Sequence, residues 1–130
     1  MPLVRLTMPE GLAPDRRAAL AESVHRALVE VAKAPADDRF QILEVGPAES
    51  IVFTPSYLGL SHRAPVVVVQ VFMNVGRTVE VKKALYAALA ENIIAAAPVR
   101  REDVIVNLVE VPRENWSFGG GVMSYPPASP

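Results

Sequence analysis

The feature that most constrains the fold is a pattern that occurs twice in the chain, 64 residues apart. In each copy an apolar strand segment is followed by a segment with helical periodicity and then by a second strand segment. Three pairs of corresponding positions keep this offset of 64 residues: Pro2 and Val66, Pro14 and Thr78, and Phe40 and Val104. The repeat predicts two tandem β-α-β units, each with a right-handed crossover between parallel strands.

Each unit contains one predicted helix. The two apolar stripes are Leu20, Val24, Leu28 and Val31 in the first helix, and Val81, Leu85, Leu89 and Ile93 in the second. Pro14 is suited to the first turn of one helix, and Thr78 to the N-cap of the other. Pro35 and Pro98 are expected to end the two helices.

The predicted strands cover residues 3–8, 40–45, 66–72 and 104–111. They predict an α/β (α+β) fold in which a four-stranded mixed sheet carries two helices on one face. The segment Val66–Phe72 reads VVVVQVF and is apolar enough to be buried on both faces. Because two helices cover only one face, we expect another subunit to cover the second.

Composition predicts one domain. The chain has 130 residues, of which 51% are hydrophobic, so it can form a sizeable core. We assign a single domain to residues 1–125 and a proline-rich tail to residues 126–130. The segment 46–65 is expected to be a long loop.

The charge balance excludes several classes of function. Thirteen Lys and Arg residues against 14 Asp and Glu residues argue against a nucleic-acid groove or a basic membrane patch. Without cysteine there is no thiolate nucleophile, and a multi-histidine metal site cannot form from His25 and His62 alone. His25 is predicted to be a helix-surface or interface residue. The N-terminal segment lacks the pattern of a signal peptide, and no run is long enough for a membrane span, so we expect a cytoplasmic protein.

The start of the chain offers a reactive group. If Met1 is removed, Pro2 carries a secondary amine at the start of a core strand. An α-amino group has a pKa of about 7.7–8.0, so its surroundings decide whether it acts as a base or an acid at neutral pH. The simpler interpretation is that Met1-Pro2 is only a processing signal.

Three segments resemble the tautomerase superfamily, and within it the malonate semialdehyde decarboxylase family. They are Pro2-Leu3, Asp38-Arg39-Phe40-Gln41 and Trp116-Ser117-Phe118-Gly119. The resemblance implies a homotrimer that acts on a small anionic oxo acid and needs no metal or organic cofactor.

The resemblance also implies site residues. Pro2 would be the catalytic amine, and Asp38 would orient water or tune that amine. Arg77 would be both catalytic and substrate-binding, and Trp116, Phe118 and Phe40 would form the apolar wall of the substrate pocket.

The sequence departs from the family pattern at two positions. Val75 stands where the decarboxylases have an arginine, and Phe40 stands where they have a tyrosine. A valine cannot act as a bidentate anchor for a carboxylate, so Arg63 or His62 would have to compensate.

Several alternatives therefore stay open at this stage. The chain could be a decarboxylase-like lyase, a keto-enol tautomerase, a hydratase, or a non-catalytic oligomeric binding protein. Asp38 could pair with Arg39, Arg77 could be a solvated side chain, and Trp116 could anchor a subunit interface.

Overall fold

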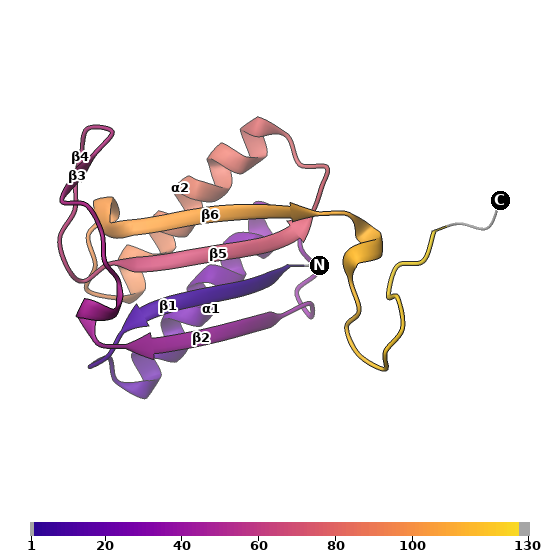
Figure 1. Cartoon of the computed structure of the whole chain (residues 1–130), viewed down its shortest axis with the longest axis horizontal. Helices are drawn as coiled ribbons and strands as arrows, with labels where there is room; N and C mark the ends of the chain where they lie inside the picture. Colours follow the sequence, from indigo (N-terminus) through magenta and orange to yellow (C-terminus); the bar gives the residue numbers. More distant parts are fainter. Residues whose placement is uncertain (1, 128–130) are drawn as a thin grey trace.

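Figure 1 shows the computed structural model, which describes residues 2–127. The main sheet contains β1 (Leu3–Pro9), β2 (Phe40–Gly46), β5 (Val67–Asn74) and β6 (Val104–Val111), in the order β2-β1-β5-β6. The pairs β1–β2 and β5–β6 are parallel, and β1 and β5 join the two units in antiparallel fashion.

Both long helices lie on the same face of this sheet. They are α1 (Pro14–Glu30) and α2 (Val79–Ala96), which contact each other along the sheet (Figure 1). The predicted four-stranded mixed sheet with two helices on one face is therefore confirmed. In the described part of the chain, no helix is long and apolar enough to cross a membrane.

Shorter elements connect the two units and follow the last strand. They are the 3-10 helices η1 (Ala48–Ser50), η2 (Arg101–Asp103) and η3 (Arg113–Asn115), and the small hairpin of β3 (Ser56–Tyr57) and β4 (Leu60–Ser61). Of the predicted tail over residues 126–130, residues 128–130 lie outside the described residues, as does Met1.

The helix ends agree with the sequence signals in three of four cases. Pro14 is the first residue of α1, and the Thr78 hydroxyl caps α2 by accepting a hydrogen bond from the N–H of Val81 at 3.2 Å. Pro98 follows the end of α2 closely. The prediction that Pro35 ends the first helix is wrong, because the chain already turns at Lys33, which has a φ of 62°. The N–H of Ala34 then donates to the carbonyl oxygen of Leu28 at 3.1 Å and closes the turn.

The core lies between the sheet and the helices. Alternate residues of the two central strands are at most 1% exposed there: Val4, Leu6, Met8, Val67, Val69, Val71 and Met73. Val68 and Phe72 point to the other face and are only half-buried. Within one chain, therefore, the segment Val66–Phe72 is not buried on both faces.

Replacing Val69 by alanine is expected to lower the free energy of unfolding by about 2 kcal/mol, because two buried methyl groups are lost and a cavity remains. The matched change Val52→Ala, at a side chain that is 94% exposed, should alter it by less than about 0.5 kcal/mol. Urea unfolding at one protein concentration measures both variants. Equal losses would contradict this assignment of the core.

Candidate active site

The topology brings distant parts of the sequence to one end of the sheet. Because β1 is antiparallel to β5, the starts of β1 and β2 lie beside the ends of β5 and β6 (Figure 1). Leu3 pairs with both Phe40 and Phe72, and Asn74 pairs with Val111. We call this end, where β1 and β2 begin and β5 and β6 finish, the Pro2 end of the sheet.

Pro2 and Asp38 lie in one narrow pocket at this end. Both residues are buried, and only 4% of the Asp38 surface is exposed. Other lining residues include His25 and Phe40, and the pocket leaves no room for a water molecule. Pro2 is held there by the first residues of β1, and Asp38 by the turn that precedes β2, where its N–H donates to the carbonyl oxygen of Pro35 at 3.0 Å.

The Asp38 carboxyl group is electrostatically perturbed. Burial raises its pKa above the usual value, and the neighbouring Asp37 charge adds to that rise. The positive charges of the amino terminus and of His25 act in the opposite direction. The carboxyl group therefore responds to the charge state of the groups around Pro2.

Arg77 follows the end of β5 and is tied to the backbone. Its Nε and Nη2 donate to the carbonyl oxygen of Ala32 at 3.3 and 3.1 Å, and its Nη1 donates to the carbonyl oxygen of Asn74 at 3.2 Å. A guanidinium has five N–H donors, so these bonds use three of them. The side chain is half-buried rather than solvated, and two donors remain for an anion.

Asn74 is a site residue that sequence analysis missed. Its Oδ1 accepts a hydrogen bond from Trp116 Nε1 at 2.5 Å, and its backbone oxygen binds Arg77. Only 9% of its surface is exposed. A polar residue at the end of an apolar strand, three positions before an arginine, is the signal that could have identified it.

Aromatic side chains form a wall beside the Pro2 pocket. The rings of Trp116 and Phe118 stack with centroids 4.9 Å apart, and Phe40 and Phe118 are 5.0 Å apart. Together with Leu3 and Ser117 they line a second pocket of about 260 Å³. This arrangement brings the three predicted aromatic residues together, and Phe40 lines both pockets.

A glycine turn returns the chain behind these rings. Gly119, Gly120 and Gly121 all have positive φ, at 135°, 69° and 70°, a conformation that favours glycine. After the turn, Ser124 accepts a hydrogen bond from the Phe118 N–H and donates its own N–H to the Trp116 carbonyl oxygen. The turn thus stabilises the position of the aromatic wall.

His62 and Arg63, which sequence analysis offered as possible substitutes for the arginine missing at Val75, lie at the opposite end of the sheet from Val75 within one chain. His62 Nδ1 is 3.5 Å from an oxygen of the buried Asp103, and the N–H of Arg63 donates to the same oxygen at 3.0 Å. Burial alone would raise the pKa of Asp103, but hydrogen bonds from Arg100 and Arg63 hold it below its usual value. These contacts connect the segment that follows β4 to η2.

Two further side chains differ from expectation. His25 is 8% exposed and therefore belongs to the buried face of α1, not to the helix surface. Arg39 forms an ion pair with Glu22 and donates to Gln41 Oε1 at 3.0 Å. Among residues 2–127, no three histidine or carboxylate side chains come together in a way that could hold a metal ion.

Replacing Asn74 by alanine is expected to release the indole of Trp116, because its N–H loses a buried acceptor. Trp116 is the only tryptophan of the chain, so the fluorescence reports on the surroundings of this indole without contributions from other tryptophans. We expect emission to move to longer wavelength and acrylamide quenching to increase. The control is Asn107→Ala, at an exposed position in β6. Unchanged fluorescence in Asn74→Ala would contradict the hydrogen bond.

Two protein-family models, both described as "Tautomerase enzyme", match residues 38–119 and 2–60. Two proteins of Bacillus subtilis (strain 168), probable tautomerase YusQ and probable tautomerase YrdN, are each 31% identical to the chain over 121 residues. The aligned region covers 93% of this chain, 95% of YusQ and 93% of YrdN.

Solved structures agree with the family models. FG41 malonate semialdehyde decarboxylase, inhibited by 3-bromopropiolate, is 36% identical with a TM-score of 0.87, over 95% of this chain and 93% of that chain. A fused 4-OT wild-type symmetric trimer is 26% identical with a TM-score of 0.78, over 94% of this chain and 95% of that chain. The chain belongs to the tautomerase family.

Proposed function

We propose that this protein is a cofactor-independent enzyme that acts on a small oxo acid through the nitrogen of Pro2, in the manner of malonate semialdehyde decarboxylase. The observation that carries the proposal is that Pro2 and Asp38, both buried, share one pocket beside an aromatic wall. The proposal requires removal of Met1. While Met1 is present, the Pro2 nitrogen is an amide and has no basic lone pair.

The free amine would be tuned by its surroundings. A low-dielectric pocket disfavours its charged form, whereas a neighbouring carboxylate favours it. Because the pocket around Pro2 and Asp38 leaves no room for a water molecule, Asp38 is better placed to set the charge on Pro2 than to orient water for attack on the substrate carbonyl. Aromatic side chains that exclude water would strengthen both interactions.

Arg77 would hold the anionic end of the substrate. Its two unused N–H donors match one carboxylate or carbonyl group, and its backbone contacts fix the plane of the guanidinium. Val75, two residues earlier, is 57% exposed and offers no second cation. Within one chain, these side chains therefore suit a substrate with a single carboxylate.

A keto-enol tautomerase is the second candidate function. It is favoured by Val75, which stands where the decarboxylases have an arginine, and by the two relatives described as probable tautomerases. The two mechanisms need opposite charge states of Pro2. A protonated amine stabilises the enolate that forms as carbon dioxide leaves, whereas a neutral amine removes a proton next to the carbonyl.

We further propose that the protein assembles as a homotrimer. Fused 4-OT structures that resemble the chain are described as symmetric or asymmetric trimers. The face of the sheet away from the helices carries half-buried or exposed apolar side chains, among them Val68, Phe72 and Ile42, which is 40% exposed. Such a face is consistent with burial against another subunit.

The variant Pro2→Ala is expected to lower kcat/KM by at least about 100-fold, because it removes the secondary amine used for proton transfer. Turnover of phenylpyruvate enol and of malonate semialdehyde measures the loss. Intact mass spectrometry first establishes that Met1 is absent in both proteins. The control is Pro126→Ala at an exposed position.

The dependence of kcat on pH distinguishes the two mechanisms. A rate that rises through the titration of the amine indicates a base, and a rate that falls indicates an acid. Full activity in Pro2→Ala, or in a protein that retains Met1, would refute the role of Pro2.

The variant Arg77→Lys is expected to raise KM by about tenfold or more, since lysine keeps the charge but loses a charge-assisted hydrogen bond of about 1.5–3 kcal/mol. The matched control is Arg16→Lys, an exposed arginine that also donates to a backbone carbonyl, that of Ala96 at 3.3 Å. Steady-state kinetics of both variants give the comparison. The same KM in Arg77→Lys and in the unmodified enzyme would argue against substrate binding by Arg77.

A further inference from the structure

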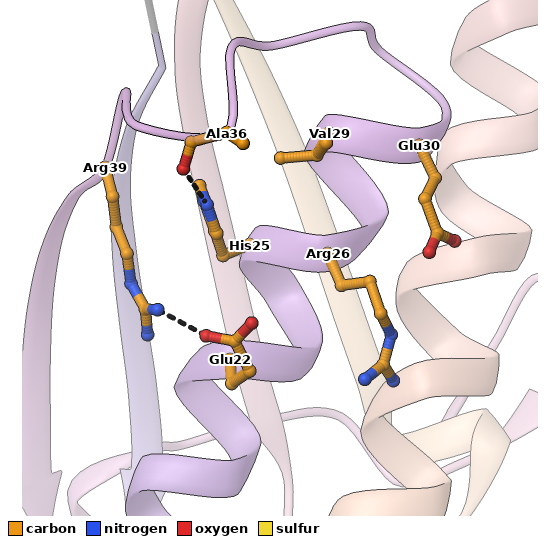
Figure 2. A pocket seen from close by; sticks show the side chains of 7 residues that line it. All are labelled: Glu22, His25, Arg26, Val29, Glu30, Ala36 and Arg39. Atoms are coloured by element: carbon orange, nitrogen blue, oxygen red, sulfur yellow. Dashed lines mark hydrogen bonds and ion pairs between the residues drawn. The ribbon is translucent and has the colours of Figure 1, made fainter.

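His25 lies between the Pro2 pocket and a second pocket that is open at the surface. On one side its ring lines the narrow pocket that contains Pro2 and Asp38. On the other side it lines a surface pocket of about 370 Å³, in which Figure 2 shows the ring between α1 and the segment that contains Ala36 and Arg39. A buried, ionisable side chain thus separates the candidate active site from solvent.

One hydrogen bond ties this ring to the segment that carries Asp38. His25 Nε2 is 2.9 Å from the carbonyl oxygen of Ala36 (Figure 2). Because a carbonyl oxygen can only accept, Nε2 carries the proton in this contact and donates it to Ala36. Ala36 is two residues before Asp38, so the bond restrains the turn that presents the carboxyl group.

The same segment is held from its other end by Arg77, which donates twice to the carbonyl oxygen of Ala32. Two basic side chains from different elements therefore bind backbone oxygens on either side of a short stretch, residues 32–36. Asp38 follows directly, and its own N–H closes a turn onto Pro35. The backbone around Asp38 is thereby fixed by contacts that reach α1 and the end of β5.

Charged side chains from α1 and from the segment that follows it surround His25. Glu22 and Arg26 belong to α1, as does Glu30, and the segment after the helix contributes Asp38 and Arg39. Arg39 and Glu22 pair with each other at the mouth of the surface pocket (Figure 2). Positive charge on His25 lowers the pKa of Asp38, against the effect of burial.

We infer that His25 is a positioning residue, which holds the Asp38 carboxyl group in place at Pro2 through its hydrogen bond to Ala36. The effect of His25 on catalysis that we predict below rests on the proposed function. Two observations on His25 support the inference. Its Nε2 binds the turn before Asp38, and its ring lines the pocket that contains Asp38 and Pro2.

The test compares two substitutions of His25. His25→Leu keeps most of the side-chain volume but removes the donor to Ala36, whereas His25→Gln keeps an N–H donor. We expect His25→Leu to lower kcat by about 10-fold to 100-fold, since a misplacement of about 1 Å of a catalytic group costs up to this factor. KM should change less than threefold, which is within about 0.7 kcal/mol. His25→Gln should recover most of kcat, and the control Arg26→Ala should change neither value.

A double-mutant cycle shows whether His25 acts through Asp38. In the Asp38→Asn background, His25→Leu should have no further effect on kcat, because the group that it positions is gone. An equal loss of kcat in both backgrounds would overturn the inference. Failure of His25→Gln to recover activity would also overturn it, as would a loss that appears only in KM.

Amide hydrogen exchange tests the restraint without any turnover. In His25→Leu the Asp38 N–H should exchange faster, while in His25→Gln it should exchange at the rate of the unmodified protein. Unchanged exchange in His25→Leu would overturn the inference, even if Pro2→Ala abolishes activity. Conversely, if Pro2→Ala remains active, the proposed function fails while the exchange result still decides the role of His25. Should His25→Leu not fold, His25→Asn replaces it, because the asparagine side chain is too short to reach Ala36.

Discussion

The antiparallel pairing of β1 with β5 is the constraint on which the site depends. It joins the two parallel β-α-β units so that the first residues of β1 lie beside the last residues of β5. If the units were joined in parallel, the start of β1 and the end of β5 would be separated by the length of a strand, roughly 25 Å for eight residues. Pro2 and Arg77 would then lie at opposite ends of the sheet. The chemistry proposed here is therefore a consequence of how the repeat is joined, not of the repeat alone.

Burial of Asp38 has an energetic cost that the surrounding contacts must offset. Because the pKa of this carboxyl group is raised in the folded protein, the folded state binds the proton more tightly than the unfolded chain. Stability therefore falls as pH rises from the ordinary aspartate pKa through the raised value. Backbone contacts of Arg77 and His25 fix the segment before Asp38 and so oppose local unfolding there.

Sequence periodicity predicts the fold well because the two helices and the central strands β1 and β5 each bury one regular face. The Thr78 cap and the boundaries of the last strand follow from local signals alone. The roles of His25 and Asn74 do not, because each depends on a partner more than ten residues away. A histidine in a helical stripe does not reveal that Ala36 returns to meet it. The same limit applies to His62 and Arg63, whose partner Asp103 follows 40 residues after Arg63.

The structure also accounts for how the aromatic wall and the cation act as one unit. Asn74 binds Arg77 through its backbone oxygen and Trp116 through its side chain, so a single residue sets the distance between the two groups. A shift of the end of β5 would move both together and would leave their relative geometry unchanged. Under the proposed function, the spacing between the guanidinium and the indole would limit the size of the substrate, and the charge on Pro2 would select the reaction.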